Sequence, residues 1–246
     1  MSQKIILANW KMQLDLVSSL KLAREYVKKI KDNSHTIIVC PDYVALAFLA
    51  PIFTDSQFKL GAQNCAPAKQ GALTGEVSPQ VIRSLGANYV IIGHSERRAR
   101  FQESPELIRD KIIAALEAQL QPVVCLGETE AIKLAGQTKI YLRRELKKIF
   151  TGLPVKSLKK IIIAYEPVWA ISTNQAAKPM KAQEASQVQQ FIKAEWQKLY
   201  QIVPPVLYGG SVKADNAQEF LAAAGVDGLL VGGASLQVGE FVKIVK

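Results

Sequence analysis

Eight short apolar runs recur along the chain roughly 30 residues apart, and each is followed by polar residues or glycines and then by a segment of helical period. The runs are KIILANW (from Lys4), TIIVC (Thr36), FKLGAQ (Phe58), YVIIG (Tyr89), PVVCLG (Pro122), KIIIAYE (Lys160), VLYGG (Val206) and GLLVGG (Gly228). They are almost continuously apolar, as parallel strands are when both faces of the sheet are buried. Eight strand-then-helix units predict an α/β fold, a (β/α)8 barrel of eight parallel strands with outer helices.

A doubly wound open sheet is the alternative fold. Such a sheet usually carries a glycine-rich nucleotide loop after its first strand, and ANWKMQ is not a loop of that kind. Ser78-Pro79 and Ser104-Pro105 each indicate a helix N-cap followed by proline at the first helical position. No linker or low-complexity tract divides the chain, so residues 1–246 are predicted to form a single barrel domain.

The composition is that of an ordinary globular protein, with 49% hydrophobic and 21% charged residues. No apolar run reaches the roughly 18 residues that a membrane-spanning helix needs. The start, MSQKIILANWKMQ, is too short in apolar residues for a signal peptide, and we expect a cytoplasmic protein. Cys40, Cys65 and Cys125 are widely spaced and predict reduced core thiols, and two histidines are too few for a multi-histidine metal site.

The formal net charge of +10 raises the question of nucleic-acid binding. The densest basic stretch, residues 141–160, contains YLRRELKKIF and KSLKK, and its charges fall on the polar positions of an amphipathic helix. It has no interleaved aromatic residues on which bases could stack. The pattern favours a solvated basic face, which would also attract an anionic metabolite.

Polar residues and glycine pairs cluster where the predicted strands end. They are Asn9 and Lys11 after the first run, Gln63 and Asn64 after the third, His94, Ser95 and Glu96 after the fourth, Glu166 after the sixth, Gly209-Gly210-Ser211 after the seventh and Gly232-Gly233 after the eighth. Since the carboxyl ends of barrel strands meet at one face, these residues predict an active site there.

Eight motifs in this order are similar to those of the triosephosphate isomerase family. They are ANWKM, AQN, GALTGEVS, GHSERR, CLGE, AYEPVWAI, YGGSV and LVGGASL, and they extend from Asn9 to about Leu236. The resemblance implies a TIM barrel that interconverts dihydroxyacetone phosphate and D-glyceraldehyde 3-phosphate in glycolysis and gluconeogenesis. It implies no cofactor and no metal.

The resemblance also assigns catalytic roles. Glu166 is the base that moves a carbon-bound proton, and His94 shuttles protons between the two substrate oxygens. Lys11 offsets the enediolate charge and Asn9 orients Lys11. Ser95 resembles the residue that holds the open-state base, and Glu96 resembles an acid that is more structural than catalytic.

The residues themselves agree with these roles. A base that acts next to a carbonyl should be a carboxylate in a site that can exclude water, and Glu166 ends a buried strand and opens a long loop. His94 begins a helix-like segment, where the helix dipole favours a neutral ring. Glycine pairs let backbone N–H groups approach an anion, so Gly232, Gly233 and Ser211 are predicted to hold the substrate phosphate.

Two further segments take their roles from the resemblance. The loop Gln63–Ser78 resembles the one that enters a second subunit, so a homodimer is expected in which Thr74 reaches the neighbour's Asn9 and Lys11. The stretch AISTNQAA resembles a lid whose usual form is AIGTGKTA, and Ser172 would donate its backbone N–H to the phosphate.

Two alternative functions remain open from the sequence. One is a different phosphosugar isomerase on the same barrel, which would not need Lys11, His94 and Glu166 together. The other is a non-catalytic basic barrel with a binding role.

Overall fold

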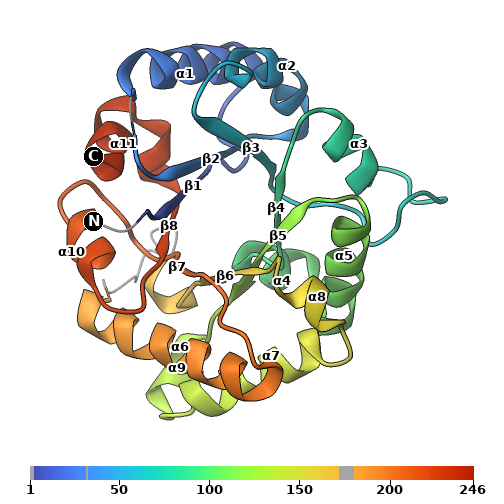
Figure 1. Ribbon diagram of the computed structural model, residues 1–246, viewed down its shortest axis with the longest axis vertical. Coiled ribbons are helices and arrows are strands. Elements are labelled where there is room, and N and C mark those ends of the chain that lie inside the picture. Colours follow the sequence, from blue (N-terminus) through green and yellow to red (C-terminus); the bar gives the residue numbers. More distant parts are fainter. Residues whose placement is uncertain (1–2, 32, 172–179) are drawn as a thin grey trace.

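The computed structural model describes residues 3–31, 33–171 and 180–246. Its sheet is a closed barrel in which each strand pairs in parallel with the next and β8 pairs with β1 (Figure 1). The strands are β1 (Ile5–Asn9), β2 (Thr36–Cys40), β3 (Phe58–Ala62), β4 (Tyr89–Ile92), β5 (Gln121–Leu126), β6 (Ile162–Tyr165), β7 (Val206–Tyr208) and β8 (Gly228–Val231). All eight predicted strands are present, and the predicted barrel is confirmed.

Helices surround the barrel wall (Figure 1). Among the described residues they are α1 (Leu16–Lys29), α2 (Tyr43–Phe53), α3 (Pro79–Ser84), α4 (Ser95–Phe101), α5 (Pro105–Glu117), α6 (Glu130–Leu134), α7 (Thr138–Phe150), α8 (Val155–Leu158), α9 (Ala182–Tyr200), α10 (Ala217–Ala222) and α11 (Val238–Val245), with short 3-10 turns η1 (Val168–Ala170) and η2 (Gly233–Leu236). Within this part of the chain, no helix is long and apolar enough to cross a membrane.

The predicted helix starts at serine-proline pairs are confirmed. The Ser78 side chain accepts a hydrogen bond from the backbone N–H of Gln80, and Ser104 accepts one from Leu107. Helix α5 ends at Glu117, although the apolar pattern ELIRDKIIAALEAQL continues to Leu120. The helix stops there because Gln119 adopts a left-handed conformation (φ 62°) and turns the chain toward β5. Caps and proline therefore define the starts of these helices better than hydrophobic period defines their ends.

Alternate strand residues build two separate apolar clusters. One set packs between the strands and the helices, and the other, which includes Leu7, Ile38, Ile91, Val123 and Ile162, packs only with other strand residues. The second set therefore fills the barrel interior, which is a packed core and not a channel. Polar groups can gather only at the two ends of this core.

The predicted basic face of α7 is exposed. Arg143, Arg144, Lys147 and Lys148 all point to solvent, while the opposite face of the helix is buried. Arg143 forms a two-point ion pair with Glu195 of α9, at 2.7 and 2.9 Å. This stretch therefore serves helix packing on one side and solvation on the other.

Candidate active site

Glu166 lies directly after β6, and its carboxylate is only 2% exposed. One carboxylate oxygen, Oε1, is 3.0 Å from Nε2 of His94, and the other accepts the backbone N–H of Ser95 at 3.1 Å. The strand end and the start of α4 thus bring together the three residues predicted around the base. Ser95 holds the carboxylate through its backbone.

The ring of His94 caps helix α4. Its Nδ1 accepts the backbone N–H of Glu96 at 3.2 Å, so that nitrogen carries no proton. The ring proton therefore sits on Nε2 and faces Glu166. This arrangement orients a neutral imidazole with its donor toward the carboxylate.

The two groups shift each other's pKa. Burial opposes the charge of Glu166, but the His94 ring, the Ser95 N–H and the Cys125 thiol outweigh it and place the pKa of Glu166 below its usual range. Burial lowers the pKa of His94, and the adjacent carboxylate of Glu166 outweighs it and leaves that pKa above its usual value. A second ring proton would have to displace the Glu96 N–H from Nδ1, so the hydrogen bonds favour the neutral ring.

Lys11 follows β1 in a left-handed backbone conformation with φ 53°. Such a conformation costs a non-glycine residue about 1–2 kcal/mol, and neighbouring side chains must hold it. The Lys11 N–H donates to Oδ1 of Asn9 at 3.1 Å, and Nε2 of Gln63 donates to the Lys11 carbonyl at 2.8 Å. Its ammonium group is 2.6 Å from Oε1 of Glu96. The side chain of Asn9 thus contacts the backbone of Lys11 directly.

Two glycines approach Glu166 too closely for any side chain. A Cβ on Gly209 would lie 2.9 Å from Cγ of Glu166, and one on Gly127 would lie 1.7 Å from its carbonyl oxygen. Gly127 and Gly209 belong to the loops after β5 and β7, which flank β6 in the barrel. They leave room for the base between two neighbouring strands.

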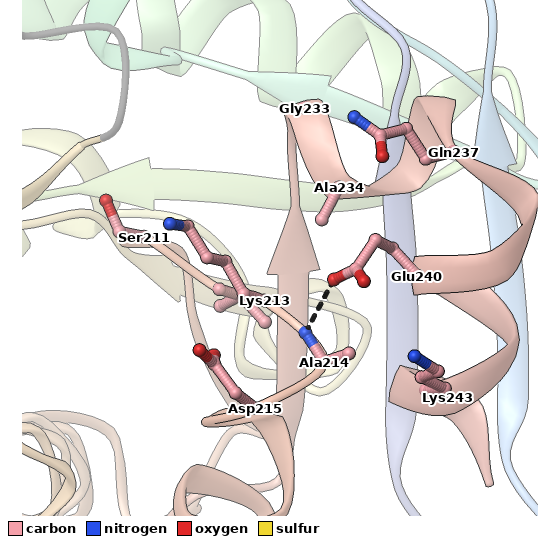
Figure 2. Close-up of a pocket in the computed structure, with 10 residues that line it drawn as sticks. Ser211, Lys213, Ala214, Asp215, Gly233, Ala234, Gln237, Glu240 and Lys243 are labelled. Carbon is pink, nitrogen blue, oxygen red and sulfur yellow. Dashed lines mark hydrogen bonds between the residues drawn. The ribbon is translucent and has the colours of Figure 1, made fainter.

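The phosphate side of the predicted site lies between the ends of β7 and β8. Figure 2 shows Ser211 and Gly233 on the rim of a pocket of about 680 Å³ that Lys213 and Glu240 also line. A carboxylate oxygen of Glu240 accepts the Ala214 N–H at 3.1 Å and ties α11 to the loop that carries Ser211.

Gly232 lies between this pocket and Lys11, because a Cβ on Gly232 would lie 3.6 Å from Cε of Lys11. The 3-10 turn η2 begins at Gly233. The glycine pair therefore stands between the lysine and the phosphate side.

Four of the predicted residues share a second pocket. Asn9, Lys11, His94 and Glu96 line one pocket of about 420 Å³. Thr74 is exposed, in a loop that projects away from the barrel before α3 (Figure 1). Ser172 and the rest of the predicted lid, residues 172–179, lie outside the described residues.

Sequence reasoning gave no role to Cys125 or Glu128. Cys125 is an apolar strand position by pattern, yet its thiol is among the groups that lower the pKa of Glu166. Glu128 is buried after β5 and accepts hydrogen bonds from Tyr165 and from Nε1 of Trp169, at 3.1 and 2.9 Å. The signal for Glu128 was present, because CLGE ends a buried strand with an acid just as AYE does.

Comparison with known proteins decides the family. The sequence model described as triosephosphate isomerase matches residues 4–246. The chain belongs to the triosephosphate isomerase family.

Individual relatives agree with this membership. Triosephosphate isomerase of Carboxydothermus hydrogenoformans is 43% identical, with 100% of this chain and 99% of the relative covered. The enzyme of Chloroflexus aurantiacus is 42% identical, with 98% and 97% covered. The crystal structure of triosephosphate isomerase from Bartonella henselae superposes with a TM-score of 0.87 at 34% identity and covers 99% of this chain and 98% of that one. The predicted family and isomerase class are confirmed, and nothing in these matches favours the two alternative functions.

Proposed function

We propose that this chain interconverts dihydroxyacetone phosphate and D-glyceraldehyde 3-phosphate through an enediolate, as the triosephosphate isomerase family does. The observation that carries the proposal is the 3.0 Å contact between Glu166 and the protonated Nε2 of His94. Lys11 lines the same pocket as His94. A base, a proton donor and a cation are the three groups that such a reaction needs.

The proton transfers follow from the geometry of these groups. Substrate enters between Glu166 and His94, and Glu166, ionised by its lowered pKa, takes a proton from the carbon next to the carbonyl. Nε2–H of His94 donates to the carbonyl oxygen, and the ring then moves a proton between the two neighbouring oxygens. Glu166 returns its proton to the adjacent carbon. Only protons move, so the reaction requires no cofactor.

Lys11 stabilises the negative charge that develops on the two oxygens. In this structure its ammonium group is paired with Glu96, and substrate must compete for it. The strained backbone of Lys11 is held by Asn9 and Gln63, so its position is set before substrate arrives. Glu96 acts through its N–H on His94 and its carboxylate on Lys11, which is a positioning role.

Ser211, Gly232 and Gly233 hold the substrate phosphate in this proposal, with Ser172 contributing from the lid. Phosphates bind where backbone N–H groups of short turns converge, and barrel enzymes commonly bind them after strands seven and eight. The adjacent Lys213 and the net charge of +10 would favour arrival of a dianion.

A homodimer is part of the same proposal. Met12 and Phe101 border the pocket that holds Lys11 and are 93% and 64% exposed, which is unusual for large apolar side chains. The projecting loop Gln63–Ser78 of a second copy would cover them, with Thr74 reaching toward Asn9 and Lys11. We also propose that residues 1–246 act as one domain in the cytoplasm.

Steady-state kinetics with purified protein test the activity. The parent should isomerise both triose phosphates, and Glu166→Gln or His94→Gln should each lose about 10²–10⁴-fold in kcat. Glu219→Gln, an exposed change on α10 with the same loss of charge, should leave kcat unchanged. A parent without isomerase activity would remove the proposal.

Mass in solution tests the dimer. The parent should elute with twice the chain mass, and Met12→Lys with Phe101→Lys should shift it to the single-chain mass. Leu134→Lys introduces a charge at another exposed apolar residue, on α6, and should remain dimeric. A parent of single-chain mass would exclude this interface.

A further inference from the structure

A second polar pocket lies at the opposite end of the barrel, where the strands begin. It has a volume of about 480 Å³, and its lining includes Lys59, Tyr89, Gln121 and Lys160. These residues stand at or next to the starts of β3, β4, β5 and β6, whereas the active-site residues follow strand ends. Because all strands run parallel, the whole barrel core separates the two sites. The volume is that of an ordinary small-molecule site.

The charges around this pocket are of one sign. Lys59, Lys159 and Lys160 line it, and the described lining residues include no carboxylate. None of the three ammonium groups forms a salt bridge with a residue that the structure describes, although eight other lysine or arginine side chains are paired with carboxylates there. The amides of Asn88, Gln119 and Gln121 complete a polar wall. Such a wall offers donors and positive charge to an anion.

The alternation of β3 directs one of these lysines inward. Phe58 and Leu60 belong to the outer cluster, so Lys59 between them starts on the side of the barrel interior. The layer above is apolar, so the ammonium group of Lys59 extends toward the lower mouth, and its side chain is exposed there. Lys160 lies in the turn between α8 and β6 and is also exposed at this pocket.

A solvated helix end explains only part of this arrangement. Lys159 is the C-cap of α8, and lysines are common there because they face the negative end of the helix dipole. Lys59 is within a strand, at an inward position that apolar residues usually fill. Helix capping does not explain why Lys59 starts on the inner side of β3. It also does not explain why Lys59 shares one cavity with Lys160, which precedes β6.

We propose that this lower pocket binds an anion with two linked phosphate groups. Lys59 approaches from β3, and Lys159 and Lys160 approach from the start of β6, with β4 and β5 between them. Because these lysines enter one cavity from two sides, an anion with charge at two points can contact both sides, whereas a single phosphate presents its charge at one point. Three positive charges also match the charge of a diphosphate.

Isothermal titration with pyrophosphate, without divalent metal and at fixed ionic strength, tests this site. The parent should bind two pyrophosphates per chain, one in the active site and one below. Lys59→Gln with Lys160→Gln should lose the second, with a Kd at least 10-fold weaker, while inhibition of the isomerase by pyrophosphate stays unchanged. Lys21→Gln with Lys28→Gln removes the same charge from exposed positions on α1 and should behave as the parent.

Side-chain amide resonances locate the bound anion. Those of Asn88, Gln119 and Gln121 should shift with pyrophosphate in the parent and not in the Lys59/Lys160 variant. A single binding event that is lost together with inhibition, or equal binding by the two double variants, would overturn the site. Inorganic phosphate should bind the lower pocket at least 10-fold more weakly, and equal affinity would overturn the two-phosphate specificity.

Discussion

The carbonyl oxygen of Ala170 accepts both hydrogen bonds that Ser211 donates, one from its backbone N–H at 3.0 Å and one from its hydroxyl at 2.9 Å. Ser211 is the residue after β7 that we propose to hold the phosphate, and Ala170 ends the turn η1 before the predicted lid. A phosphate that takes the Ser211 N–H must therefore release Ala170. If Ser211 holds the phosphate as proposed, phosphate binding would be coupled through this one oxygen to the residues that precede the predicted lid.

Trp169 should report this coupling. It neighbours Ala170, donates to Glu128 at 2.9 Å and packs under the ammonium group of Lys133, so displacement of Ala170 changes its surroundings. Titration with inorganic phosphate should change tryptophan emission in the parent and not in Trp169→Phe. Trp196→Phe, which changes a buried indole of α9, should retain the response. A response that survives Trp169→Phe would disprove the coupling.

Replacement of Glu166 should lower the pKa of His94. In the parent the carboxylate outweighs burial, and in Glu166→Gln burial and Lys11 remain while that carboxylate is gone. The ring should then stay neutral to lower pH than a free histidine. NMR titration resolves this easily, because His35 is the only other histidine in the sequence and its pKa should be the same in both proteins. An unchanged His94 titration would contradict the assignment.

Removal of the Cys125 thiol should move the acid limb of kcat/KM to higher pH. The thiol stabilises the ionised form of Glu166, and only that form can accept a proton, so Cys125→Ala raises the pKa below which activity is lost. Cys40→Ala makes the same deletion in the interior cluster, and Cys40 is not among the groups that hold Glu166 ionised. It should keep the parent pH profile. Identical limbs in the two variants would show that the thiol has no such effect.

A methyl group on Gly209 should displace the base. The new Cβ would lie 2.9 Å from Cγ of Glu166, so Gly209→Ala should lower kcat about 100-fold while the barrel stays folded. Gly239→Ala in α11 meets no heavy atom within 4 Å and should keep kcat and add about 0.5–1 kcal/mol of stability. Equal turnover in both variants would be inconsistent with a crowded Glu166.

The predicted lid carries a sequence departure with a measurable effect. Ser172 and Asn174 stand where the family pattern has glycines, and a positive φ at either site would cost about 1–2 kcal/mol. Lid closure would then be disfavoured roughly 5- to 30-fold. Ser172→Gly with Asn174→Gly should raise turnover or the affinity for a phosphate analogue. If both stay unchanged or fall, the glycines are not needed in this chain.

The fold was predictable because the strands are buried on both faces and because two helix starts carry a serine cap followed by proline. The strand-end positions of Asn9, His94 and Glu166 followed from the barrel, since parallel strands bring their ends together. The effect of Cys125 on the pKa of Glu166 was not predictable. The alternation pattern marks an inward strand position as apolar and does not indicate which groups that side chain faces. The tautomer of His94 also required coordinates, since it depends on the direction of one backbone N–H.

The contact of Ser211 with Ala170 joins loops of β7 and β6, and no local pattern encodes it. The inward lysine of β3 could have been found by counting alternation along the strand. Its relation to Lys160 required the pairing order of four strands. Sequence patterns therefore predicted which residues occupy the carboxyl end of the barrel, and the structure was needed to determine their partners.

The closed pairing of β8 with β1 has a consequence for how activity is gained during synthesis and refolding. Gly232 at the end of β8 lies against Lys11 at the end of β1, so the first and last parts of one site are more than two hundred residues apart in the chain. A growing chain can form helices and most strand pairs before this neighbour exists. Recovery of turnover during refolding therefore reports when the barrel closes between β8 and β1. It should lag behind the recovery of the circular-dichroism signal of the helices.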